Sequence, residues 1–331
     1  MTANTSSERT SSEGASSERT GTAQLTAAMV LSGTLGIFVV ESGASAFDVV
    51  FFRVLFGALA LGAYAFARGY FRDHGLTLEK LSLAALGGVF IVFNWVFLFK
   101  AYEATSISLA TVVYHTQPFF LVLLSALVLR ERLSRFQLGW LAAAFAGLVL
   151  VSGVRPGDAG SLAGIGLALL AALLYALSTL VTKRVTGVRP HLIALTQVVV
   201  GIPLLLPFAD FGAMSGTGTG WAWLVGLGVI HTGLMYVLMY AAYAKLPTAK
   251  IAVLAFTYPA VAMVADWAVY GHHIGLVQAL GVPLIVLASL KVTLARAANP
   301  APARAARPAP RTAAHGTEDA SPTAMRAAST R

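Results

Sequence analysis

Residues 94–140 read NWVFLFKAYEATSISLATVVYHTQPFFLVLLSALVLRERLSRFQLGW, and this stretch decides how the rest of the chain is interpreted. It holds most of one apolar helix, a short polar turn and a second apolar helix with a proline, Pro118, at mid-length. An Arg-Glu-Arg triplet and the start of a third apolar helix follow. The same order of features returns about 141 positions later, where Pro259 matches Pro118. The match predicts a membrane protein built twice from one helical unit.

The composition supports a membrane environment. Of the 331 residues, 57% are hydrophobic and only 11% are charged, whereas a soluble domain carries about 25% charged residues. Most of the surface therefore cannot face water. The chain has no cysteine, which excludes disulfides and thiolate metal sites. The net charge of +9 is compatible with a nucleic-acid partner, but its distribution along the chain indicates membrane topology instead.

Ten apolar stretches are long enough for helices that cross a bilayer, which need about 20 residues each. They lack the alternation of barrel strands, so we expect an all-α polytopic membrane protein. The flanking tracts 1–24 (rich in Ser, Thr, Glu and Arg) and 297–331 (rich in Pro, Ala and Arg) have little to bury and are predicted to be disordered. The predicted spans are 25–42, 47–67, 81–102, 107–129, 136–153, 162–182, 191–209, 221–243, 249–270 and 274–295.

Lysine and arginine predict the orientation of these spans. With the N-terminus in the cytoplasm, 20 of the 23 basic residues fall on the inner side, as the positive-inside rule requires. Both termini are thus expected in the cytoplasm, with the lipid bilayer of the plasma membrane as partner and no nucleic acid. Each half of the chain, 25–155 and 156–296, holds five spans. An odd number per half predicts two repeats inserted with opposite orientations, the inverted-repeat plan of many secondary transporters.

Five short motifs occur in order in the first repeat: Phe52-Arg53, Ala101-Tyr102, Pro118, Glu131-Arg132 and Gln137-Leu138-Gly139. With these motifs the chain resembles the EamA family of the drug/metabolite transporter superfamily over about residues 25–295. The second repeat departs from the family pattern, because Tyr270-Gly271-His272-His273 stands where a glutamate is expected. The resemblance implies ten helices in two five-helix repeats and transport without a cofactor.

Polar side chains within the spans are the candidate site, because such residues are costly in a bilayer and normally face a cavity. Arg53 is expected to bind an anionic group of the substrate or to form an outer gate, while aromatic side chains hold an apolar part of the substrate. The alternatives are that Arg53 extends toward the outer membrane surface or pairs with Glu41 or Asp48. The residues predicted to line one central cavity are Arg53, Asn94, Trp95, Tyr114, His115, Tyr175, Thr179, His231 and Tyr236.

Three residues are candidates for carrying a coupling proton: His115, His231 and Asp266. The ordinary pKa of histidine suits this task. The alternative for the histidines is a hydrogen bond between helices, and for Asp266 a cap at the membrane surface. Glu131 and Arg132 follow the fourth span on the inner side. They form either an inner gate or a turn anchored by positive charge.

The sequence therefore predicts a secondary transporter, an exporter of small metabolites such as amino acids or drug-like amphipathic compounds, with proton coupling as an option. Signatures of catalysis are missing, including H-E-x-x-H, G-x-S-x-G, the Walker A loop and Cys/His metal patterns. We thus expect no enzyme activity, no metal and no cofactor. The alternatives are a membrane enzyme acting on a lipid or prenyl substrate, and a non-transporting scaffold or sensor. A homodimer is compatible with all three.

Overall fold

The structure is a computed structural model, and it describes residues 3–72, 74–129, 135–152, 159–212, 218–246, 251, 254–255, 257–273 and 275–298. This part of the chain is helical and contains no strand. The helices of the first half are α1 (Ala3–Glu41), α2 (Ala46–Ala67), α3 (Leu78–Ala104), α4 (Ile107–Tyr114), α5 (Gln117–Leu129) and α6 (Arg135–Ser152). Those of the second half are α7 (Ala159–Thr182), α8 (Pro190–Leu205), the 3₁₀ turn η1 (Leu206–Phe208), α9 (Gly218–Gly228), the π-helix η2 (Val229–Leu234), α10 (Met235–Tyr243), α12 (Thr257–Tyr270) and α13 (Leu276–Ala298).

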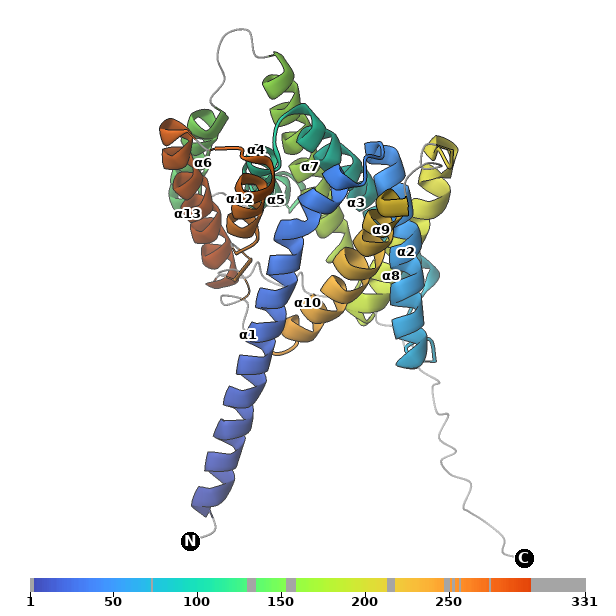
Figure 1. Cartoon of the computed structure of the whole chain (residues 1–331). Helices are drawn as coiled ribbons and strands as arrows, with labels where there is room; N and C mark the ends of the chain where they lie inside the picture. Colours follow the sequence, from blue (N-terminus) through green and yellow to red (C-terminus); the bar gives the residue numbers. More distant parts are fainter. Residues whose placement is uncertain are drawn as a thin grey trace, which may run out of the picture.

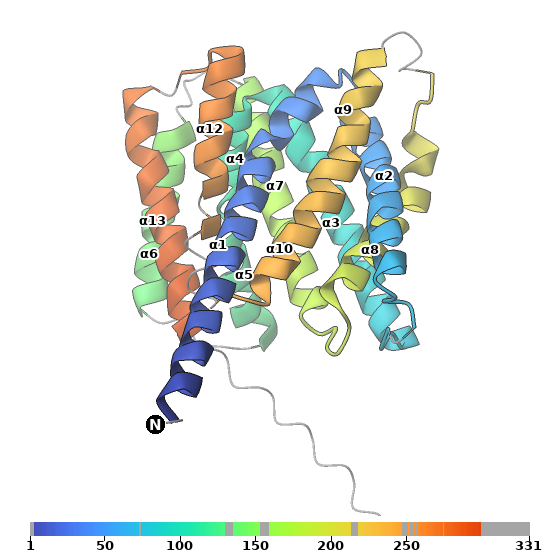
Figure 2. The same ribbon diagram turned by 60° about the horizontal axis from the view of Figure 1, so that its bottom comes forward.

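The helices lie side by side in one bundle, with α6 and α13 together at one edge (Figures 1 and 2). Seven of the described helical segments are long and apolar enough to cross a membrane: Ser16–Glu41, Ala46–Ala67, Leu78–Ala104, Ile107–Leu124, Leu162–Thr182, Pro190–Phe208 and Gly218–Tyr243. The other three predicted spans coincide with α6, α12 and α13. The fold is therefore that of a multi-span helical membrane protein, and the full count of ten spans remains a prediction.

Local sequence signals explain where several helices begin. The hydroxyl of Ser45 accepts a hydrogen bond from the backbone N–H of Asp48, and Thr77 and Ser106 cap α3 and α4 in the same way. Such caps satisfy N–H groups that a helix cannot pair internally. They place these helix starts within three residues of the predicted spans.

Two features differ from the prediction. The span 107–129 is interrupted at His115-Thr116. Pro118 explains the break, because its ring clashes with the carbonyl four residues earlier and it has no backbone N–H to donate to that carbonyl. Helix α1 begins at Ala3, whereas the composition predicts a disordered tail up to residue 24. Within this part of α1 the hydroxyls of Thr20 and Thr22 donate to the carbonyls of Ser16 and Glu18, one turn back. Of the predicted tail 297–331, residues beyond 298 lie outside the described part.

The polar part of α1, around Gly21 and Gln24, contacts the C-terminal end of α10. The Lys245 ammonium donates to Gln24 Oε1 at 2.9 Å, and a Cβ at Gly21 would lie 2.9 Å from that of Lys245. The N-terminal part of α1 protrudes from the bundle (Figure 2). The last residues of the predicted tail are thus packed.

Glycines allow α2 and α8 to approach their neighbours closely. A Cβ at Gly57 in α2 would lie 2.7 Å from Thr232 Cγ2 in η2, and one at Gly201 in α8 would lie 2.8 Å from Val92 in α3. The internal alignment of the sequence pairs Gly57 with Gly201. Each therefore lets the second helix of one half pack on the third helix of the other half.

Candidate functional site

Arg53 lies at the centre of the candidate site. It belongs to α2 and is only 2% exposed. Its Nε donates a hydrogen bond of 3.0 Å to Thr232 Oγ1 in η2, and its guanidinium carbon lies 4.0 Å from the centroid of the Trp95 ring and 5.7 Å from that of Phe99. The Nη1 atom is buried and has no hydrogen-bond partner among the described residues. Arg53 is thus held by a neutral hydroxyl and two aromatic faces.

The expected alternative for Arg53, a pair with Glu41 or Asp48, is absent from the described contacts. Asp48 instead accepts a hydrogen bond from the Ser45 hydroxyl at 2.6 Å and one from the backbone N–H of Asp210 at 2.7 Å. Glu41 accepts a hydrogen bond from the Tyr270 hydroxyl at 2.9 Å. Both carboxylates are therefore used at the helix ends, away from the guanidinium.

The π-helix η2 presents His231 and Thr232 to α1 and α2. Short π-helices within α-helices often occur at functional sites. Thr232 meets Arg53, while His231 Nε2 lies 3.2 Å from Thr34 Oγ1 in α1. The His231 ring also contacts Phe38 edge-on, with centroids 4.4 Å apart. The histidine is fully buried, so the predicted hydrogen bond between helices is present. Hydropathy predicts the span but gives no sign of the π-turn.

Four of the chain's ten tyrosines lie near Arg53, on α3, α4, α10 and α12. Three more lie near members of this group, and we call all seven the tyrosine cluster. The sequence predicts Tyr114, Tyr175 and Tyr236 as cavity residues, whereas the other four join them only through tertiary packing. The cluster consists of Tyr102, Tyr114, Tyr175, Tyr236, Tyr240, Tyr243 and Tyr258.

Two members of the tyrosine cluster are partly exposed. Tyr175 on α7 is 37% exposed, and Tyr243 on α10 is 41% exposed. Tyr175 nevertheless packs edge-on against Tyr114, with ring centroids 6.0 Å apart, and lies near Tyr236, Tyr240 and Tyr243. Its ring therefore faces other helices of the protein.

The remaining predicted cavity residues have local partners. Asn94 is fully buried; its amide donates to the Ala171 carbonyl at 2.7 Å and to the Tyr114 hydroxyl at 3.2 Å, which joins α3, α4 and α7. His115 follows α4, where its Nδ1 lies 3.0 Å from the Thr111 carbonyl, and its ring lies 5.1 Å from that of Tyr258. Thr179 bonds to its own helix, donating to the Tyr175 carbonyl.

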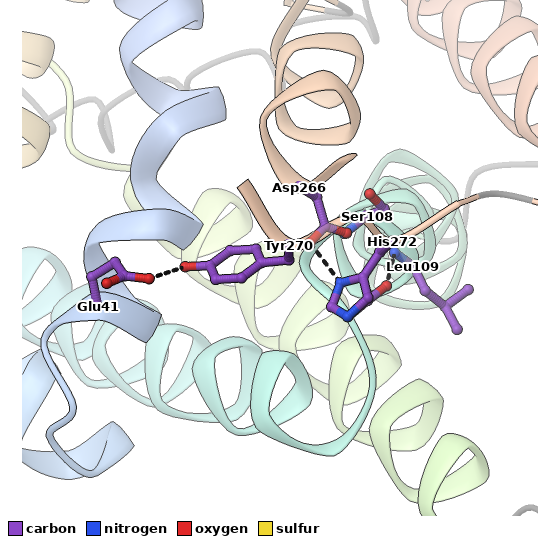
Figure 3. A network of polar contacts seen from close by, with 7 residues as sticks. Glu41, Ser108, Leu109, Asp266, Tyr270 and His272 are labelled. Atoms are coloured by element: carbon purple, nitrogen blue, oxygen red, sulfur yellow. Dashed lines mark hydrogen bonds and ion pairs between the residues drawn. The ribbon is translucent and has the colours of Figure 1, made fainter. Parts of the chain in front are cut away.

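Asp266 forms a separate polar cluster at the end of α12 (Figure 3). Its carboxylate is fully buried. One oxygen accepts a hydrogen bond of 2.9 Å from the backbone N–H of Ser108 in the first turn of α4, and the other lies 3.0 Å from His272 Nδ1. The Tyr270–Glu41 hydrogen bond lies beside it and reaches α1 (Figure 3). The structure thus places Asp266 apart from Arg53, where it joins α12 to α4.

The proposed inner gate, Glu131 and Arg132, lies outside the described residues. Within the part that the structure covers, no group of three His, Asp or Glu side chains could hold a metal ion.

The fold and the apolar helices define the chain as a multi-span helical membrane protein. Residues 20–153 and 162–294 each match the EamA-like transporter family, and the chain belongs to that family. It is 34% identical to the uncharacterized transporter YxxF of Bacillus subtilis (strain 168) over an alignment of 281 residues. The alignment covers 84% of this chain and 90% of the relative.

Two further likenesses are informative. The chain is 30% identical over 217 residues to a protein of Rhizobium johnstonii named riboflavin transporter, covering 64% of this chain and 68% of that one. A crystal structure of another protein, 19% identical in sequence, covers 86% of this chain and 99% of its own length with a TM-score of 0.59. The latter likeness concerns the fold alone.

Proposed function

We propose that the protein is a secondary transporter that exports small metabolites across the plasma membrane by alternating access. Amino acids and drug-like amphipathic compounds are the proposed range of substrates. The observation that carries the proposal is Arg53, a buried charged side chain whose Nη1 atom lacks a hydrogen-bond partner. Ionisable residues within membrane spans are costly and usually mark a substrate or ion pathway.

The tyrosine cluster supports a substrate with a flat apolar part. Aromatic rings offer large faces for such a group, and their hydroxyls can hydrogen-bond polar atoms. The Rhizobium relative is named a riboflavin transporter, and riboflavin contains a flat ring system. We infer that Arg53 holds a polar end of the substrate while the tyrosine cluster and Trp95 contact its ring.

The helix packing supports two repeats of opposite orientation. Helix α3 packs on α7, and its counterpart α10 packs on α1. Helices α4 and α5 pack on α7, and their counterpart α12 packs on α1. Likewise α2 contacts α9 and η2, whereas α8 contacts α3. Exchanging the two halves therefore reproduces the packing pattern, which is the symmetry that alternating access uses in inverted-repeat transporters.

Proton coupling through His115, His231 or Asp266 is the mechanistic part of the proposal. His231 supports it by position, because it neighbours Thr232, the residue that binds Arg53. A histidine that exchanges a proton during the cycle would link substrate export to proton entry.

An export assay tests the proposal. Cells lacking the chain, cells producing it and cells producing Arg53→Gln would be compared by untargeted metabolite analysis of medium and cytoplasm. We expect at least one compound to accumulate outside only with the wild-type chain. Equal metabolite profiles in all three strains would contradict the proposal, as would strictly inward movement.

A further inference from the structure

The positive charge of Arg53 has no partner of opposite sign in the described part of the chain. Its one hydrogen bond goes to the neutral hydroxyl of Thr232. Its closest aromatic neighbour is the face of Trp95, at 4.0 Å. The titratable groups near it are the tyrosines Tyr102, Tyr114, Tyr236 and Tyr258, whose hydroxyls are neutral at physiological pH, and His231, whose imidazole is either neutral or positive. The site therefore carries a net positive charge when it is empty.

The sequence extends this finding to every predicted span. Within the ten spans, carboxylates occur only at Glu41, Asp48 and Asp266, each among the first or last five residues of its span. All three already have partners at those ends: the Tyr270 hydroxyl for Glu41, the Ser45 hydroxyl for Asp48 and the Ser108 N–H for Asp266. No carboxylate near the middle of a span is left to receive a substrate ammonium group.

These charges decide which ligands are favourable. A buried charge without a partner raises the free energy of the protein. A bound anion that pairs with Arg53 lowers this free energy. A monoanion would leave the complex neutral. A zwitterion would bring an ammonium group close to Arg53 without a carboxylate to bind it, and a cation would be repelled, since like charges in contact cost several kcal/mol.

We propose that the Arg53 site takes organic monoanions that have a flat apolar body and no ammonium group. The inference rests on the proposed transport function and narrows it, because it excludes ordinary amino acids. The carboxylate or other acidic group of the substrate accepts hydrogen bonds from the unpaired Nη1 atom of Arg53, and the tyrosine cluster contacts the ring.

A set of probes with one ring and different charges tests this inference. 3-Phenylpropionate, phenylalanine and phenethylamine share a phenyl ring on a short chain and differ in their charged groups, which are a carboxylate alone, a carboxylate with an ammonium group, and an ammonium group alone. Riboflavin adds a flat neutral compound. Dissociation constants for the purified full chain would be measured by calorimetry. We expect 3-phenylpropionate to bind about tenfold or more tightly than phenylalanine, which corresponds to about 1.4 kcal/mol or more, and phenethylamine to bind most weakly.

Two substitutions on α2 provide the matched comparison. Arg53→Gln should weaken the binding of 3-phenylpropionate about tenfold or more, as expected for losing a hydrogen bond to a charged group. Arg68→Gln removes a charge from the exposed C-terminal end of the same helix and should leave the affinity unchanged. Should Arg53→Gln fail to fold, Arg53→Lys keeps the charge without the planar fork. It should bind more weakly but retain the order of the probes.

The outcomes separate this inference from the proposed function. The inference would be overturned if phenylalanine or riboflavin bound as tightly as 3-phenylpropionate. If Arg53→Gln also abolished this binding, a transport site at Arg53 would still be supported. Absence of 3-phenylpropionate binding would also overturn it. The expected order of affinities without flux in proteoliposomes would support the inference and contradict transport.

Discussion

The carboxylate of Asp266 accepts a hydrogen bond of 2.9 Å from the backbone N–H of Ser108, across 158 positions of sequence. The contact places a negative charge at the N-terminal turn of α4, where unpaired N–H groups and the helix dipole favour an anion. His272 completes the arrangement from the segment after α12 (Figure 3). This end of α12 is therefore fixed to the first repeat by charge as well as by packing.

Replacing Asp266 with asparagine should destabilise the protein by about 1–3 kcal/mol, because the change removes a charged acceptor from a buried N–H group. The measurement is the melting temperature of the purified protein in detergent. The control is His272→Gln, whose side chain is 54% exposed. It should cost less than about 1 kcal/mol, because the imidazole is open to water and its contact with Asp266 is therefore screened. Equal losses in the two variants would show that the contact with Ser108 is not the stabilising one.

The close approach of α2 to η2 predicts a different response at two glycines of the same helix. A Cβ at Gly57 would lie 2.7 Å from Thr232 Cγ2, whereas the nearest atom to a Cβ at Gly62 is 4.0 Å away. Gly57→Ala should therefore destabilise the protein by about 1–3 kcal/mol through overpacking. Gly62→Ala should be neutral or stabilising by up to about 1 kcal/mol, since alanine favours helices.

Gly57→Ala should also impair transport beyond its effect on stability, because it displaces the residue that binds Arg53. Flux per folded molecule in proteoliposomes measures this effect. Normal flux in a correctly folded Gly57→Ala protein would show that the Arg53–Thr232 contact does not matter for the transport cycle.

Much of the fold could be predicted because membrane helices are long and uniformly apolar. The internal sequence alignment also matches Gly57 in the first half with Gly201 in the second. Both glycines are sites of close contact between helices. The site was harder to predict. Arg53 stands out as a charge within a span, but its neighbour Thr232 depends on a π-turn that no hydrophobic pattern signals. Tyr258 on α12 is distant in sequence from Tyr114 on α4 and joins the tyrosine cluster only through tertiary packing.

The distribution of basic residues predicts both termini on the cytoplasmic side. The chain has no cysteine, so single cysteines can be introduced without a background. A cysteine at His273, in the exposed segment after α12, should react with a membrane-impermeant maleimide added to intact cells, and one at Ser134 should react only after permeabilisation. Labelling of the Ser134 variant from outside would contradict the inverted-repeat arrangement, since the loop would then lie on the wrong side.

His231 and His115 are the two histidines proposed to carry a coupling proton. Glutamine is similar in size to histidine and keeps a polar group, but it cannot titrate. If His231 carries the coupling proton, His231→Gln should abolish the dependence of flux on a pH gradient in proteoliposomes while retaining substrate binding. His115→Gln tests the second candidate in the same way, and His74→Gln, in the exposed segment between α2 and α3, is the control. A normal response to pH in both His231→Gln and His115→Gln would exclude these histidines as proton carriers. Structural hydrogen bonds would then explain why these residues lie within the membrane. His231 bonds to the Thr34 hydroxyl, and His115 bonds to the Thr111 carbonyl.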